Sequence, residues 1–154
     1  MAQSVTRICL IANVPTIDEV LQTHAAELGR DFTAYRNHVY RVLNLCAAMA
    51  DEGADLEKIA VAAVFHDLGI WTNKTFDYLA PSIALAREYV AAKGSAGWIV
   101  EIETMIEEHH KITGAGAAAG SLVEPFRRAD WIDVTRGLRT FGVPRELIAS
   151  VFRR

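Results

Sequence analysis

The sequence has little cysteine, no long apolar run and no excess of one charge. Its 154 residues include only two cysteines, Cys9 and Cys46, which cannot form a disulfide framework. The longest apolar stretches, such as residues 59–65, have about seven residues, whereas a membrane-spanning helix needs roughly eighteen. We therefore expect a protein of the reducing cytoplasm that does not cross or bind a membrane.

The charge balance also excludes a general attraction to polyanions. Sixteen basic and nineteen acidic residues leave a formal net charge of −3, so we expect no nucleic-acid polymer as a partner. Any anionic substrate has to be bound by local cations. A chain of about 150 residues is typical of one domain. Residues 1–154 are therefore predicted to form a single domain, with its motif-bearing core at about 32–136, and the oligomeric state is left open.

Apolar residues recur at three- and four-residue intervals along most of the chain, which is the period of amphipathic helices. We expect an all-α bundle of about six or seven helices. Thr16 and Asp55 are predicted to cap the first and third helices, and Gly69 to end the third, which is apolar almost all round and should be buried centrally. The predicted helices cover residues 17–28, 32–50, 56–68, 82–92, 98–111, 124–136 and 144–152.

Two segments lack a clear period. Residues 71–78 mix polar and aromatic side chains and are expected to form an ordered loop over a pocket. Residues 113–121 are rich in glycine and alanine, but no strand precedes them and no Gly-Lys-Ser/Thr follows, which favours a linker over a phosphate-binding loop. Four aromatic residues can line a pocket or stack on a base, although packing is the simpler interpretation: Trp71, Phe76, Tyr78 and Trp131.

Four of the five histidines lie in or at the ends of predicted core helices, and only His24 is expected at the surface. His66 and Asp67 are adjacent at the end of the most apolar helix, where both need partners to avoid a desolvation cost of several kcal/mol. One divalent metal ion would satisfy both. Imidazole nitrogen with carboxylate oxygen suits Mn, Fe, Co, Ni or Zn, and Mg is a further candidate.

The order of these residues resembles the HD-domain superfamily of metal-dependent phosphohydrolases. His38 follows an asparagine in one helix, His66-Asp67 end a second, and Asp130 follows Arg-Ala in a late helix, so that the pattern covers about residues 35–133. The resemblance implies that these four residues hold one metal ion. It also implies hydrolysis of a small phosphorylated substrate, nucleotides included, by metal-activated water.

The resemblance suggests roles for further residues. Asp67 would also orient the attacking water, and His109 or His110 would stabilise the phosphate charge or protonate the leaving oxygen. Asp133 shares a helix face with Asp130 and would orient a ligand or contact a substrate hydroxyl, a solvent-facing position being the alternative. Four cations can bind the substrate phosphate, or be solvated surface charges: Lys74, Lys111, Arg127 and Arg128.

Two features usual in parts of the family are missing. Ala34 and Ile70 stand where members that act on cyclic dinucleotides have Glu and Lys, and no histidine occurs between His66 and His109, where binuclear members commonly have one. One ion is therefore expected rather than two. His109 and His110 match late paired histidines that bind a second metal in some relatives, or they cap a helix end. The alternative functions are a di-iron oxygenase, another non-phosphate hydrolase or lyase, and a non-catalytic metal-binding or ligand-sensing domain.

Overall fold

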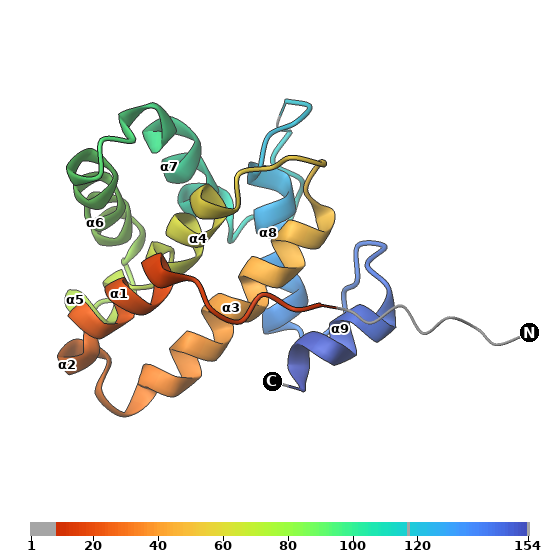
Figure 1. Cartoon of the computed structure of the whole chain (residues 1–154), viewed down its shortest axis with the longest axis horizontal. Coiled ribbons are helices and arrows are strands. Elements are labelled where there is room, and N and C mark those ends of the chain that lie inside the picture. The colour runs from red at the N-terminus through yellow and green to blue at the C-terminus, as the bar shows by residue number, and fades with distance from the viewer. Residues whose placement is uncertain (1–8, 117, 154) are drawn as a thin grey trace, which may run out of the picture.

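The computed structural model describes residues 9–116 and 118–153, and all regular elements in these ranges are helices (Figure 1). The predicted all-α bundle is confirmed. Two short helices, α2 (Ala25–Leu28) and α5 (Gly69–Thr72), and two 3₁₀ turns, Gly29–Asp31 and Ala96–Trp98, join the longer elements. Seven helices have eight residues or more: α1 (Pro15–Thr23), α3 (Phe32–Met49), α4 (Leu56–Phe65), α6 (Leu79–Ala92), α7 (Ile99–Glu108), α8 (Val123–Val134) and α9 (Arg145–Phe152).

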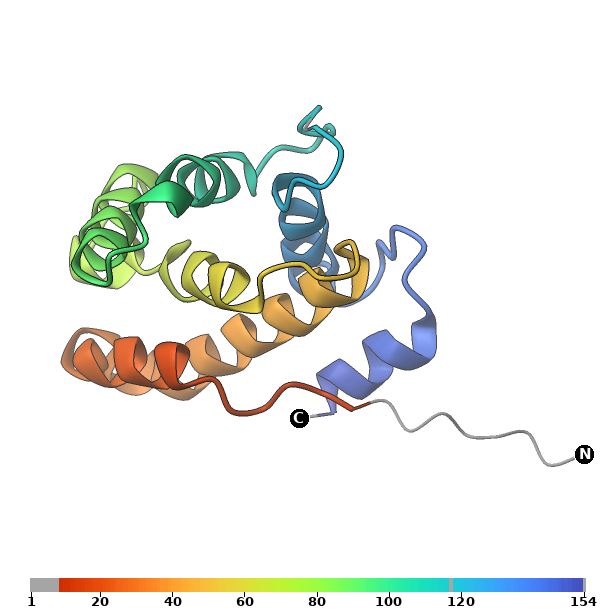
Figure 2. The ribbon, with the colours of Figure 1, turned by 45° about the horizontal axis from the view of Figure 1, so that its top comes forward.

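Helix α4 is the centre of the bundle, as its apolar composition predicts. Every residue from Ile59 to its end at Phe65 is buried. It contacts α1, α3, α6 and α7, and Figure 2 shows it between α3 on one side and the α6–α7 pair on the other. Helix α3 packs most extensively against α8 and α4. The end of α4 and the middle of α3 therefore lie deep in the protein.

The start of the first helix differs from the prediction. Thr16 does not cap it; its hydroxyl donates to the Glu57 carboxylate, 41 positions later in the chain. The helix begins at Pro15, which suits a first position because proline has no N–H and a fixed φ. The expected continuous helix over residues 17–28 is interrupted at His24, which is half-buried and so only partly at the surface.

The cap and the end of α4 place the His-Asp pair. Asp55 caps the helix as predicted, because its carboxylate accepts hydrogen bonds from two backbone N–H groups of the first turn. The helix ends at Phe65, earlier than expected, since the N–H of Leu68 donates to the Phe65 carbonyl at 3.1 Å in a tighter, 3₁₀-type turn. His66 and Asp67 therefore lie in the turn that follows the helix.

Gly69 does not end α4 but begins α5, and it sets a close approach to α6. Its N–H donates to the Ser82 hydroxyl at 2.9 Å. A Cβ at this position would lie 2.5 Å from the Tyr78 carbonyl oxygen and 2.9 Å from the Ser82 hydroxyl oxygen. The absence of a side chain therefore lets the turn that carries the His-Asp pair pack against the start of α6.

Gly69→Ala is expected to lower the free energy of unfolding by about 2–3 kcal/mol, because backbone and buried side chains cannot easily move away from the added methyl group. Urea unfolding of the variant measures this loss. Gly97→Ala is the matched control, since a Cβ there meets nothing within 4 Å and the change should stay within about 0.5 kcal/mol. Equal stability of the two variants would contradict the packing argument.

The remaining boundaries move by a few residues. Helix α6 begins at Leu79, ahead of the predicted start at 82, because Pro81 fits within its first turn. Helices α7 and α8 end earlier than predicted, so His109 and His110 follow α7 directly. Between α7 and α8, residues 113–116 and 118–121 form no helix, as expected of a linker. No helix in the described ranges has the length and apolar character to span a membrane.

Candidate metal centre

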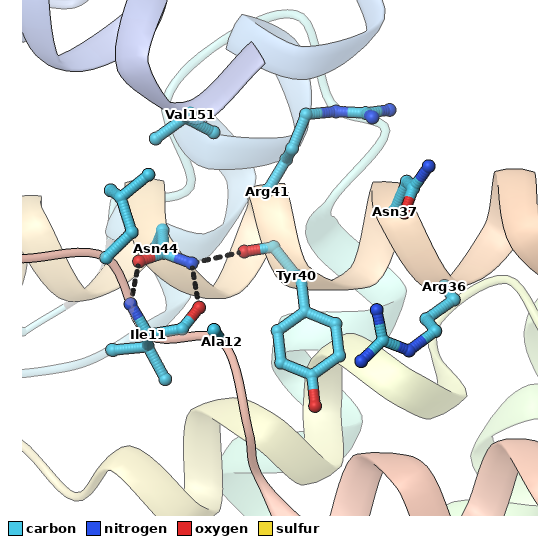
Figure 3. A pocket seen from close by; sticks show the side chains of 9 residues that line it. Ile11, Ala12, Arg36, Asn37, Tyr40, Arg41, Asn44 and Val151 are labelled. Carbon is cyan, nitrogen blue, oxygen red and sulfur yellow. Dashed lines mark hydrogen bonds between the residues drawn. The ribbon is translucent and has the colours of Figure 1, made fainter. Parts of the chain in front are cut away.

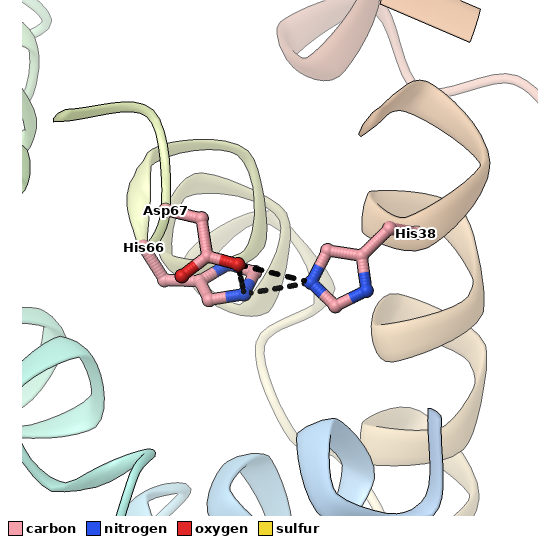
Figure 4. Close-up of side chains that lie close together, drawn as sticks. All are labelled: His38, His66 and Asp67. Carbon is pink, nitrogen blue, oxygen red and sulfur yellow. Dashed lines mark hydrogen bonds and ion pairs between the residues drawn. The ribbon is translucent and has the colours of Figure 1, made fainter. Parts of the chain in front are cut away.

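The four predicted metal ligands come together from three parts of the chain. His38 lies in the middle of α3, His66 and Asp67 follow α4, and Asp130 is in α8. Figure 4 shows the first three side chains pointing toward one another. His38 Nε2 lies 3.0 Å from His66 Nε2 and 3.4 Å from Asp67 Oδ2. Asp130 Oδ1 is 3.5 Å and 3.6 Å from the same two ring nitrogens.

Three histidines in this cluster share one arrangement, in which Nδ1 contacts an oxygen acceptor. The Nδ1 atoms of His66 and His109 lie 2.7 Å and 2.5 Å from the carbonyl oxygen three residues earlier. A carbonyl only accepts, so each Nδ1–H donates. In the neutral ring Nε2 then carries the lone pair. The Nδ1 of His38 lies 2.6 Å from the Asp133 carboxylate, which is likewise an acceptor. Fixing Nδ1 in this way while Nε2 stays available is the usual arrangement of histidines that bind metals.

Several polar atoms of the cluster are buried without a hydrogen-bond partner in the described structure. His66 and His109 are fully buried and Asp130 is only 5% exposed. The unpaired atoms are Asp67 Oδ1, His109 Nε2 and Asp130 Oδ1. An unpaired buried polar atom costs about 1–3 kcal/mol, and a cation among these atoms would remove that cost. The donor set fits a divalent ion of the Mn, Fe, Co, Ni or Zn group.

Mutual charge interactions shift the pKa values of these groups. Burial by itself would lower the pKa of His66, but the Asp67 and Asp130 carboxylates raise it well above its usual range. Burial would also lower the pKa of His38, but hydrogen bonds to Asp133 and Asp67 outweigh burial and raise it. Burial would raise the pKa of Asp67, but the three histidines hold it well below its usual range. The carboxylates thus favour protonated imidazoles in the metal-free centre, and a divalent ion can replace such protons.

Asp133 lies behind His38, on the side away from the other ligands. Its buried carboxylate lies 2.6 Å from the ring Nδ1 of His38 and accepts hydrogen bonds from Arg41 Nε at 2.5 Å and Nη2 at 3.2 Å. Burial would raise the pKa of Asp133, but His38 and Arg41 lower it, so the group remains an ionised acceptor. These contacts match the orienting role among the alternatives for Asp133. Sequence reasoning missed Arg41, whose only signal is its position three residues after His38.

Asp133→Asn is expected to weaken metal binding about 10- to 100-fold, because an amide is a poorer acceptor and holds His38 less firmly. Competition with a chromophoric chelator measures the affinity. Asp77→Asn is the control, since Asp77 is an exposed aspartate in the loop before α6. An Asp133→Asn protein that binds metal as tightly as this control would refute the orienting role.

A second group of close ligand atoms adjoins the first. It consists of Asp67, His109 and His110, and His109 Nε2 lies 3.3 Å from Asp67 Oδ1. His110 is exposed to solvent, and its ring Nε2 is hydrogen-bonded to the Tyr78 hydroxyl. Burial and the neighbouring His109 lower the pKa of His110. Asp67 thus has Oδ2 toward His38 and His66 and Oδ1 toward His109.

Of the aromatic residues singled out in the sequence, only Tyr78 contacts this cluster. Trp71 packs against Tyr35 with ring centroids 4.7 Å apart. Phe76 is 97% exposed, and the Trp131 indole N–H donates to a backbone carbonyl at 3.0 Å. The sequence pattern predicted only a stacking or pocket-lining role for the Tyr78 ring, whereas the structure places its hydroxyl against His110 of the candidate site.

Three of the four predicted substrate-binding cations have partners elsewhere. Arg127 and Arg128 both bind Glu124, at 2.7 Å and 2.8 Å, and with a backbone N–H they lower its pKa to about 2. Lys111 pairs with a glutamate one turn earlier at 2.6 Å, and Lys74 is exposed. No ion pair between described residues joins any of the four to the cluster, so their substrate-binding role remains a prediction.

The fold and this cluster define an all-α protein with a buried His/Asp centre between helices, and the comparison with known families agrees. The HD domain family matches residues 35–135, which is more than half of the chain. The matched segment includes every residue of the cluster. The chain therefore belongs to the HD domain family, whose members are mostly metal-dependent phosphohydrolases. No curated protein and no solved structure gives a significant match.

Proposed function

We propose that the protein is a metal-dependent phosphohydrolase that acts on a small phosphorylated molecule, nucleotides included. The observation that carries the proposal is the convergence of imidazole Nε2 atoms and carboxylate oxygens, several of which have no hydrogen-bond partner among the described residues. Family membership supports the same chemistry. His38, His66, Asp67 and Asp130 would hold one divalent ion, with Mn, Fe, Co, Ni, Zn and Mg as candidates.

The surrounding residues can carry out the proton transfers of phosphate-ester hydrolysis. When bound, the ion supplies Lewis acidity, which activates water and polarises a phosphoryl oxygen. Asp67 accepts a hydrogen bond from the attacking water and orients it. His109, whose Nε2 has no hydrogen-bond partner among the described residues, donates from this atom to a phosphoryl oxygen when its ring is protonated. His110, which is more exposed, gives a proton to the leaving oxygen, while the Tyr78 hydroxyl holds its ring in place.

A centre with two ions is the second candidate. The observation that favours it is the Asp67–His109–His110 group beside the first cluster. Two irons would extend the chemistry to oxygen-dependent oxidation, and two other ions to non-phosphate reactions. The Tyr78 hydroxyl hydrogen-bonds to His110 Nε2, so a second ion would have to displace it or bind this ring through Nδ1, which favours one ion.

Elemental analysis of protein purified without added metal or chelator tests the proposal, followed by a phosphate-release screen of the metal-loaded protein with phosphomonoesters and nucleotides. We expect about one equivalent of metal and phosphate release from at least one compound class. Two irons per chain with an oxygen-dependent absorbance change would support the second candidate. Bound metal without phosphate release would refute the phosphohydrolase, and no metal even after incubation with Mn or Ni would refute both.

A further inference from the structure

A cavity of about 110 Å³ lies between α3, the segment before α1 and the end of α9. Residues 10–12 form one wall, α3 forms the other, and Val151 of α9 adjoins them (Figure 3). The α3 wall consists of residues 36, 37, 40, 41 and 44, which recur on one face of the helix. His38 lies outside this set, so the cavity is separate from the metal centre.

The wall opposite α3 is held in a fixed position. Asn44 accepts a hydrogen bond from the Ile11 N–H at 2.8 Å and donates to the Ile11 carbonyl at 2.9 Å. Figure 3 shows this pair of bonds together with a third, from Asn44 to the Tyr40 carbonyl. The Tyr40 hydroxyl accepts a further bond from the Val14 N–H at 3.0 Å. The segment is therefore bound to α3 at two points, which fixes this wall of the cavity relative to the helix.

The charge of the cavity is opposite to that of the protein. Among the described residues, the only charged side chains that line it are Arg36 and Arg41, although the chain has a net charge of −3. Arg41 uses Nε and Nη2 to bind Asp133, and its Nη1 has no hydrogen bond to any residue that the structure describes. Arg36 Nε lies 3.5 Å from Asp18 Oδ1, and no hydrogen bond joins the two side chains in the described structure. N–H donors of both guanidinium groups therefore remain available.

Two features prepare these donors for a ligand. The Arg36 guanidinium lies over the Tyr40 ring, 4.6 Å from its centroid, which limits the side-chain freedom that would be lost on binding. The half-buried Asn37 amide also lines the cavity and has no hydrogen-bond partner in the described structure. Two cationic forks and an amide around one small space form a donor set for an anion with several acceptor oxygens.

We propose that this cavity is a binding site for a small tetrahedral oxyanion of the phosphate or sulfate class, bound by Arg36, Asn37 and Arg41. Its volume is well below the roughly 300–1,000 Å³ of pockets that hold drug-sized ligands, so it fits a free anion and not a nucleotide. Arg41 binds Asp133 and so also contacts the support of His38, whereas Arg36 and Asn37 contact no residue of the metal centre among the bonds described. Substitution of Arg36 therefore tests the cavity separately.

Calorimetric titration of inorganic phosphate into the chelator-treated, metal-free protein tests the proposal. We expect saturable binding of one phosphate per chain, competition by sulfate and weaker competition by acetate, which has only two oxygens. Arg36→Gln should lower the affinity about tenfold, as expected for the loss of charge-assisted hydrogen bonds. Arg87→Gln is the control and should keep the affinity, because Arg87 is an exposed arginine of α6 that pairs with Glu103.

Absence of saturable binding to the metal-free protein would overturn the proposal, and so would equal affinities of the Arg36→Gln and Arg87→Gln proteins. Phosphate binding that needs metal and is lost in Asp67→Asn would assign the anion to the metal centre instead. Circular dichroism checks the fold of Arg36→Gln, and Asn37→Ala serves as a second variant, with a smaller expected loss. Because the titration uses metal-free protein, its result does not depend on whether the protein is a phosphohydrolase.

Discussion

Asp67→Asn is expected to abolish metal binding and turnover together. Asp67 is the one residue common to both groups of close ligand atoms in the described structure, with Oδ2 3.3 Å from His66 Nε2 and Oδ1 3.3 Å from His109 Nε2. An asparagine of the same size replaces one oxygen by an NH₂ group and removes the negative charge. Metal content should fall from about one equivalent to near zero. Losing several kcal/mol of transition-state stabilisation corresponds to at least about a 1,000-fold lower rate of phosphate release.

Elemental analysis and the phosphate-release assay, run on the same preparations, check this expectation. Asp51→Asn is the matched control, because Asp51 is exposed and precedes α4 far from its C-terminal turn. Urea unfolding of both proteins separates loss of a ligand from loss of the fold. Full metal content and undiminished turnover in a folded Asp67→Asn protein would exclude Asp67 as a ligand.

Local sequence patterns predicted which segments are helical but not where each helix ends. The apolar spacing of α3 predicted a helix over 32–50, and the structure has one at Phe32–Met49. The errors in the predicted helix boundaries occur where contacts with residues distant in the sequence determine the local structure. Thr16 binds Glu57 and not its own helix, and Gly69 packs against the start of α6. Such contacts lie outside any local window of sequence.

In the candidate site, too, the sequence predicted some features and missed others. The ordered pattern of His38, His66, Asp67 and Asp130 singled out four residues that the structure brings together. The carbonyl groups that fix the histidine tautomers belong to the backbone, so side-chain identities do not reveal them. Arg41 is equally hidden, because an arginine on a helix is usually solvated.

The sequence alone already contains evidence against Arg127 and Arg128 as substrate-binding cations. Arg127 and Arg128 follow Glu124 by three and four residues within one helix, which is the spacing of intrahelical ion pairs. That spacing indicates that both guanidinium groups have a partner on their own helix. It therefore argues against either of them as the local cation for an anionic substrate.

The stability of the metal-free protein is expected to fall as the pH rises from about 6 to about 8. The sign of this change in stability follows from the pKa values of His38 and His66 in the folded protein. Burial alone would lower both values, but the carboxylates of Asp133, Asp67 and Asp130 raise them. Both histidines bind protons more tightly in the folded than in the unfolded chain, where their pKa is about 6.5. Their contribution is therefore fully present below about pH 6.5 and is lost as the pH rises through the folded values.

Bound metal is expected to reverse this slope, because coordination needs unprotonated Nε2 atoms and proton competition weakens as the pH rises. At free metal about 1,000 times the dissociation constant, the gain in unfolding free energy is about 4 kcal/mol. Urea unfolding at pH 6, 7 and 8, with chelator or with excess Mn, measures both slopes. His38→Gln should flatten the metal-free slope, since it removes one of the two rings whose pKa is raised. A metal-free stability that rises over this range would mean that the carboxylates do not hold protons on these histidines, and the electrostatic description of the centre would be wrong.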